Sequence, residues 1–105
     1  MKKKYENVWI SSVHLKPLSG NIIIPNAKGA VVNVLFVADS DNDYKQTVLE
    51  ALEHMHFQLI SFDEVNLFNS IADDNLNDKE LLSLAKKAVK TGYVLFSTYY
   101  TYDEE

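Results

Sequence analysis

Short apolar runs and alternating apolar positions predict four strands along this chain. In the first strand, Val8 and Ile10 fall on one face of the extended chain, and Val13 and Leu15 fall on the other. The second strand is rich in valine and apolar on both faces, which is typical of a strand in the centre of a sheet. The four predicted strands cover residues 5–15, 29–38, 57–62 and 93–102.

Two other segments have the period of amphipathic helices. The first has apolar residues at positions 44, 48, 51, 52 and 55, directly after Ser40 and Asp41, either of which can cap a helix. The second is expected to begin after Asp78 and to end before Gly92, because glycine is favoured just beyond a helix C-terminus. Residues 65–77 combine a helical turn with an aspartate-rich loop.

The predicted elements follow the order β-β-α-β-α-β. Two helices are too few to cover both faces of a four-stranded sheet, so the pattern favours an α+β two-layer sandwich. In this arrangement a mainly antiparallel sheet carries both helices on one face, and part of the other face contacts water or a partner. The length of 105 residues fits one domain, and we expect a single α+β domain over residues 1–105.

Acidic residues are concentrated in the middle of the chain. Residues 37–80 contain eleven acids and two lysines, a net charge of −9, whereas residues 1–36 have a net charge of +4 and residues 81–105 a net charge of 0. The whole chain has a formal net charge of −5 at pH 7. A negative surface on a small domain attracts basic partners and repels phosphate backbones.

The residue types that are absent narrow the possible functions. All ten basic residues are lysines, and arginine is the side chain best suited to bidentate phosphate recognition, so we expect no nucleic-acid partner. The chain has no cysteine, which excludes disulfides and thiolate metal sites. The lysines at positions 2–4 are followed by Tyr5-Glu6-Asn7 and not by an apolar run. We therefore expect no secretion signal, no membrane partner and a cytoplasmic location.

The acids after the second strand have the spacing of a calcium loop. Asp39, Asp41, Asp43 and Glu50 match positions 1, 3, 5 and 12 of an EF-hand loop. The sixth position requires glycine for its sharp turn, but it is Tyr44 here, which also begins the helical pattern. Aspartates at a helix start explain the same residues, and we expect no calcium site.

The histidines offer a weak metal motif. His54 and His56 point about 200° apart if both are helical, and they share a face only if the helix ends before them. A histidine at the end of a helix is also favoured by the helix dipole, so we predict no metal ligands. His14 stands alone on the first strand and is expected to pack at an edge of the sheet.

No catalytic motif is present in the sequence. Ser11, Ser12, His14 and Asp39 could meet across adjacent strands, but nothing resembles a nucleophile elbow. The three glycines form no phosphate-binding loop. We therefore predict that the protein is not an enzyme and that it uses no cofactor.

The last predicted strand is rich in tyrosine. Tyr93, Tyr99, Tyr100 and Tyr102 lie on it, and Trp9 lies on the first strand. Tyrosine is enriched at protein–protein contacts, but it also has a high strand propensity, so the pattern fits either an interface or an ordinary edge strand. Without arginine, stacking of RNA bases on these rings is a poor alternative.

Taken together, the chain resembles the small acidic immunity proteins of bacterial contact-dependent growth inhibition and polymorphic-toxin systems. The resemblance lies in a Trp-bearing opening strand (residues 8–13), a Val-Val-Asn-Val central strand (residues 31–34) that leads into an Asp-rich helix start, and a Tyr-rich closing strand. It implies a protein that binds one cognate toxin domain, often a basic nuclease. Such families have no invariant site, so the resemblance assigns no individual residue.

We expect a non-enzymatic binding protein that neutralises a basic, nuclease-type toxin domain by covering its active site. The alternatives are a small-molecule-binding regulatory domain and a small enzyme, both of which require a pocket. The sequence does not determine the oligomeric state. The acids expected to contact the toxin, by mimicking substrate phosphates and steering association, are Asp39, Asp41, Asp43, Glu50, Glu53, Asp63, Glu64, Asp73 and Asp74.

Overall fold

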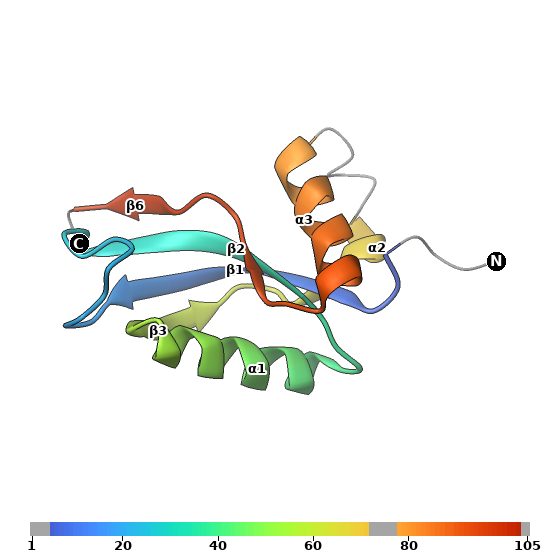
Figure 1. Ribbon diagram of the computed structural model, residues 1–105, viewed down its shortest axis with the longest axis horizontal. Coiled ribbons are helices and arrows are strands. Elements are labelled where there is room, and N and C mark those ends of the chain that lie inside the picture. Colours follow the sequence, from blue (N-terminus) through green and yellow to red (C-terminus); the bar gives the residue numbers. More distant parts are fainter. Residues whose placement is uncertain (1–4, 72–77, 104–105) are drawn as a thin grey trace.

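The computed structural model describes residues 5–71 and 78–103. Over these residues the sheet is built on one long hairpin, β1 and β2, with shorter strands on both sides, and three helices pack around it (Figure 1). The elements are β1 (Val8–Pro17), β2 (Gly29–Val37), α1 (Asp41–His54), β3 (Phe57–Phe62), β4 (Asn66–Leu67), α2 (Phe68–Ile71), α3 (Lys79–Thr91), β5 (Leu95–Phe96) and β6 (Tyr100–Tyr102).

All strand pairings in this sheet are antiparallel. β1 pairs with β2 along eight residues, from Val8 opposite Val37 to Leu15 opposite Ala30. β3 and β4 pair with successive parts of the other side of β1, and β5 and β6 pair in the same way with β2. The predicted α+β class with a mainly antiparallel sheet is therefore confirmed. In the described part of the chain the predicted four strands become six, because β4 is an additional short strand and the segment 93–102 contains two strands.

The helices do not share one face of the sheet, so that part of the prediction is wrong. α1 lies below the sheet and α3 lies above it in Figure 1. The core under α1 contains Val13 and Leu15, whereas the core under α3 contains Val8 and Ile10. Because alternate residues of a strand point to opposite faces, β1 supplies apolar side chains to one core from its first half and to the other core from its second half.

The core beneath α1 is centred on strand β2. Val48 and Leu52 of α1 are fully buried against it, as is Tyr44. The Tyr44 hydroxyl donates a 2.7 Å hydrogen bond to the backbone oxygen of Val34, so this side chain is satisfied inside an apolar environment. The helix begins as predicted, because the Ser40 side chain accepts a hydrogen bond from the backbone N–H of Asp43.

The second core joins α2 and α3 to the opposite face. Leu81 and Ala85 of α3 are buried together with Phe68 of α2 and Tyr5, and the Tyr5 and Phe68 rings meet edge to face at 5.1 Å. Both predicted ends of α3 are confirmed. The Asp78 carboxylate accepts from the Leu81 N–H at 3.1 Å, and Gly92 has a φ of 73° at the C-terminus.

The loop between β1 and β2 is fastened to the end of α1 by a buried asparagine. Asn21 Nδ2 donates to the backbone oxygens of Met55 and His56, at 2.9 and 3.3 Å. Its Oδ1 accepts from the N–H groups of Ile23 and Ile24. One side chain therefore satisfies a helix end and shapes the loop at the same time.

Candidate functional site

The structure distributes the nine predicted partner-binding acids over two places. Five lie on or just before α1, and Asp63 and Glu64 follow β3. Asp73 and Asp74 lie outside the described residues. The residues on or before α1 are Asp39, Asp41, Asp43, Glu50 and Glu53.

We call Asp41, Asp43, Glu50 and Glu53 the α1 acidic surface. All four side chains are exposed, and the last three fall within about 80° of one another, opposite the buried stripe of the helix. Lys45 is the one lysine of α1, which gives the helix a net charge of −3. Among the described residues none of these acids has a basic partner, and Glu50 accepts only from Gln46. Their field therefore reaches solvent without internal compensation.

The spacing that resembles a calcium loop is folded as helix. Asp43 and Glu50 lie in the one continuous helix Asp41–His54, two turns apart, so the loop that would wrap an ion does not form. Over residues 5–71 and 78–103, no group of three acid or histidine side chains is arranged to hold a metal ion.

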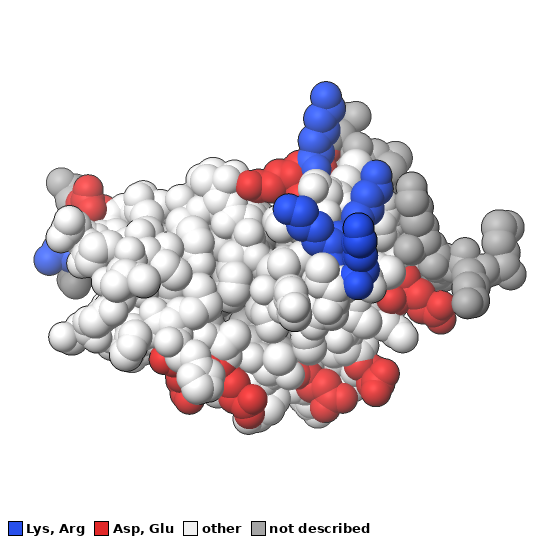
Figure 2. All heavy atoms as spheres, in the orientation of Figure 1, with Lys and Arg blue, Asp and Glu red and all other residues white. Residues whose placement is uncertain are grey.

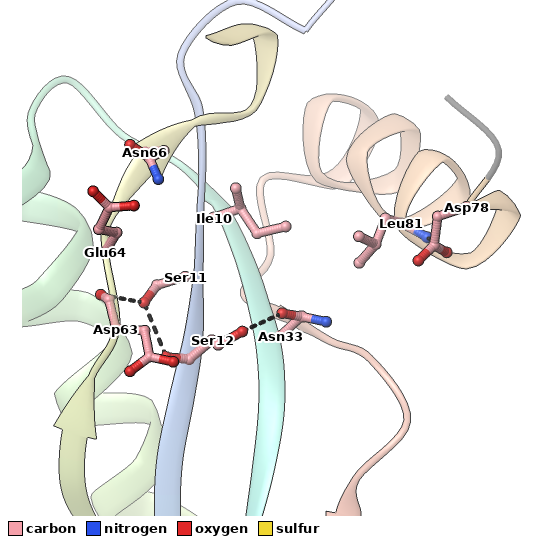
Figure 3. A pocket seen from close by; sticks show the side chains of 9 residues that line it. All are labelled: Ile10, Ser11, Ser12, Asn33, Asp63, Glu64, Asn66, Asp78 and Leu81. Carbon is pink, nitrogen blue, oxygen red and sulfur yellow. Dashed lines mark hydrogen bonds between the residues drawn. The ribbon is translucent and has the colours of Figure 1, made fainter. Parts of the chain in front are cut away.

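Asp63 and Glu64 line a shallow pocket of about 660 Å³ on the side of the sheet that carries α3 (Figure 3). The pocket lies between the segment after β3 and the N-terminus of α3, which contributes Asp78 and Leu81. Its lining is mixed: three carboxylates surround uncharged polar side chains and two apolar ones. The remaining lining residues are Ile10, Ser11, Ser12, Asn33 and Asn66.

Hydrogen bonds fix the floor of this pocket. Ser12 Oγ donates to Asn33 Oδ1 at 2.9 Å, across the β1–β2 pair (Figure 3). Ser11 Oγ donates to the backbone oxygen of Asp63 at 3.0 Å. Because both hydroxyls serve structural bonds, neither is oriented by a histidine as a nucleophile would be. The His14 ring instead forms a hydrogen bond with the hydroxyl of Tyr102.

The tyrosines of the closing segment divide into two kinds. Tyr99 stacks between Phe57 and Phe96, and burial raises its pKa to about 12. Tyr93 and Tyr100 are exposed by 69% and 61%, respectively. Tyr100 pairs with Val31, which is also exposed, on the half of the sheet face that α3 leaves open. Of the tyrosines that fit either an interface or an edge strand, Tyr93 and Tyr100 therefore present exposed rings to a partner.

Lysines gather on α3, and this feature does not appear in charge sums over long sequence segments. The exposed lysines of α3 lie at positions 79, 86, 87 and 90. The helix has one acid, Glu80, so its net charge is +3. Figure 2 shows them clustered over α3, while acidic side chains follow α1 along the lower edge of the molecule. The molecule thus carries an acidic helix and a basic helix on opposite faces of its sheet.

Asp78 and the α3 lysines are the features that sequence reasoning missed. Asp78 was expected only to cap a helix, whereas it also lines the pocket. The net charge of each predicted helix, summed separately, would have revealed the basic character of α3. Summing residues 37–80 placed Asp78 and Glu80 with the acids of α1, although both belong to the start of α3.

Comparisons with protein-family models, with curated proteins and with solved structures find no match to this chain. Within the described part of the chain, no helix is both long enough and apolar enough to span a membrane.

Proposed function

We propose that this protein is a non-enzymatic binding protein that recognises a basic protein through the α1 acidic surface. In the cell its partner would be a toxin domain, most readily a nuclease, whose phosphate-binding active site the acids of α1 cover. The protein would act in the cytoplasm, where such a toxin reaches its substrate. The observation that carries the proposal is an exposed helix face with a net charge of −3 and no internal basic partner among the described residues.

The geometry supports recognition of a surface in preference to a single ion. The α1 acids extend over about 18 Å of helix, from Asp41 to Glu53, and all are exposed to solvent. A row of carboxylates on a rigid helix imitates the repeated charge of a nucleic-acid backbone, which is what a nuclease surface is built to bind. Such complementarity acts chiefly on the rate of association.

The test is reversal of charge on α1. In the variant Glu50→Lys/Glu53→Lys, both changes fall on the exposed side of the helix, so the fold should be retained. We expect association with a basic, nuclease-type toxin domain that the wild-type protein binds to slow by about tenfold or more at low salt, and its salt dependence to flatten. Stopped-flow binding measures the rate, and growth of toxin-expressing bacteria measures protection.

The matched control is Glu6→Lys/Asp103→Lys, which makes the same change in formal charge at two exposed positions outside α1. It should bind and protect nearly as well as the wild type. If both double variants bind equally fast, net charge alone guides association and the α1 acidic surface is not the binding site.

The pocket favours a second candidate, a small-molecule-binding regulatory domain. Its floor presents Ser12, Asn33 and Asn66 beside the carboxylates of Asp63 and Asp78, a set suited to a small polar ligand. Amide chemical shifts recorded against a metabolite library test this candidate. A ligand that shifts the pocket resonances and leaves α1 unchanged would favour regulation over toxin binding.

A further inference from the structure

The loop between β1 and β2 presents apolar side chains to water. Ile22 is 90% exposed, Ile23 is 42% exposed and Leu18 is 45% exposed. They lie around one tight turn, which the Asn21 backbone N–H closes by donating to the Leu18 oxygen at 3.0 Å. Single exposed apolar residues are common on protein surfaces, but adjacent ones are typical of contact sites. We call these residues, 18–23, the isoleucine loop.

The fold holds this loop in place but does not use its most exposed side chain. Asn21 is buried, and its side-chain amide fixes the loop through the four hydrogen bonds described above. Ile24, the third isoleucine of the run, packs against the core beneath α1. Ile22 buries almost none of its surface, so it adds little to folding stability. A loop that is fixed in advance loses little conformational entropy when it binds, which favours affinity.

The isoleucine loop adjoins the α1 acidic surface. Asn21 binds the backbone oxygen of Met55 at the C-terminal end of α1, and Glu53 lies two residues before Met55. The backbone N–H of Leu18 donates to the oxygen of His56 at 2.8 Å. In Figure 1 the loop lies beside this end of α1, and Figure 2 shows acidic side chains following the helix. An apolar patch therefore borders a row of acids.

We propose that the isoleucine loop inserts into an apolar pocket beside the cationic site of the basic protein that α1 binds. The anchor rests on the function proposed above and adds a second contact to it. A stable interface buries about 800 Å² on each partner, and three partly exposed aliphatic side chains supply only a fraction of this area. The neighbouring face of α1 has to supply the rest, and its acids select a basic partner.

Size and charge disfavour the other occupants of this loop. A myristoyl chain, with much more apolar surface, gives only marginal membrane binding, and the acids of α1 would be repelled by anionic lipids. A second copy joined loop to loop would bring two acidic helices toward each other. A basic protein satisfies both the apolar and the acidic part of the surface.

Ile22→Ser removes the anchor without changing the charge of the molecule. The probe is a basic, nuclease-type toxin domain that the wild-type protein binds, as in the charge-reversal test. We expect this complex to dissociate about tenfold faster or more, with an association rate within about twofold of the wild-type rate. The effect should be the same at low and high salt, because salt screens charges and not apolar contacts. Surface plasmon resonance measures both rates.

Val89→Ser is the matched control. This β-branched side chain is also exposed, by 53%, but it lies on α3, on the other side of the sheet. Its complex should dissociate at the wild-type rate. Equal dissociation rates for Ile22→Ser and Val89→Ser overturn the proposal. So does a lower melting temperature of Ile22→Ser, which would show that Ile22 serves the fold.

The charge-reversal variant separates failure of the anchor from failure of the proposed function. If Glu50→Lys/Glu53→Lys slows association while Ile22→Ser dissociates like the wild type, α1 binds the partner and the anchor is refuted. If only Ile22→Ser weakens binding, the loop is the anchor and α1 is not the binding surface. A wild-type protein that binds no basic nuclease domain refutes both. Vesicles of phosphatidylcholine and phosphatidylglycerol that sediment the wild type, but not Ile22→Ser, assign the loop to a membrane and overturn the proposal.

Discussion

Replacing Tyr44 by phenylalanine tests how α1 is fixed to the centre of the sheet. The hydroxyl is fully buried and donates at 2.7 Å to the backbone oxygen of Val34 in β2, while the ring packs near Phe62. Phenylalanine keeps the ring and removes only the donor. A buried hydrogen bond contributes about 0.5–1.5 kcal/mol, and an acceptor left without its partner costs somewhat more, so we expect a loss of about 1–2 kcal/mol in unfolding free energy.

The loss should depend on pH in a predictable direction. Burial raises the pKa of Tyr44 well above its ordinary value of 10, mainly because the ionised phenol would lose its hydration. Above pH 10 the unfolded chain releases this proton and the native protein keeps it, so the stability that is fully present below pH 10 is lost as pH rises. The decrease is about 1.4 kcal/mol per pH unit and is absent from the phenylalanine variant. The two proteins should therefore become equally stable near pH 11.

Urea unfolding of both proteins at intervals from about pH 7 to 11 provides the measurement. Tyr100→Phe is the matched control, because this ring is 61% exposed and its substitution should change stability by less than about 0.5 kcal/mol. Equal stability of Tyr44→Phe and wild type at pH 7 would show that the hydroxyl contributes nothing. A difference that stays constant up to pH 11 would refute the reasoning about its ionisation.

Three further substitutions test local features by urea unfolding. Ser40→Ala should cost about 0.5–2 kcal/mol through loss of the helix cap, whereas Asp39→Ala, one residue earlier and exposed, should change little; similar values would place the cap elsewhere. Asn21→Ala should cost about 2–3 kcal/mol, because it breaks the bonds from the loop to the end of α1; a cost below ~0.5 kcal/mol would mean that water replaces the amide. Gly29→Ala places a methyl group on the Tyr102 hydroxyl and should cost about 1–2 kcal/mol; in a Tyr102→Ala background this cost should largely disappear, and full additivity would contradict the overlap.

Local pattern predicted the elements well where the deciding interactions are close in sequence. The third strand was predicted at the residues where it occurs, 57–62, and the caps Ser40, Asp78 and Gly92 act as expected. The closing segment was less predictable because distant contacts interrupt it. Ser97 bonds the backbone of Asn33, and Thr98 bonds Glu80, and these bonds draw the chain out of the strand between β5 and β6.

The placement of the helices on opposite faces of the sheet follows from the order of apolar residues along β1, and not from the number of predicted helices. On β1 the apolar residues change face along the strand, from Val8 and Ile10 to Val13 and Leu15. A strand that serves one helix layer would keep one apolar face throughout. Likewise the acids of the candidate site were identifiable from sequence. The sequence did not predict that these acids divide between α1 and the pocket. That division arises because the chain pairs with β1 again after α1, through β3 and β4, which places Asp63 and Glu64 at the pocket.

The two cores on opposite faces of one hairpin also protect its strand register. If β1 shifted by one residue, His14 and Lys16 would turn toward α1, while Val13 and Leu15 would turn toward water on the open half of the other face. The same shift would remove Val8 and Ile10 from beneath α3. A one-residue shift of β1 would therefore remove apolar side chains from both cores at once. The packing of α1 and the packing of α3 each make this wrong register unfavourable. In a hairpin with a single covered face, the same register shift would cost the burial of one core only.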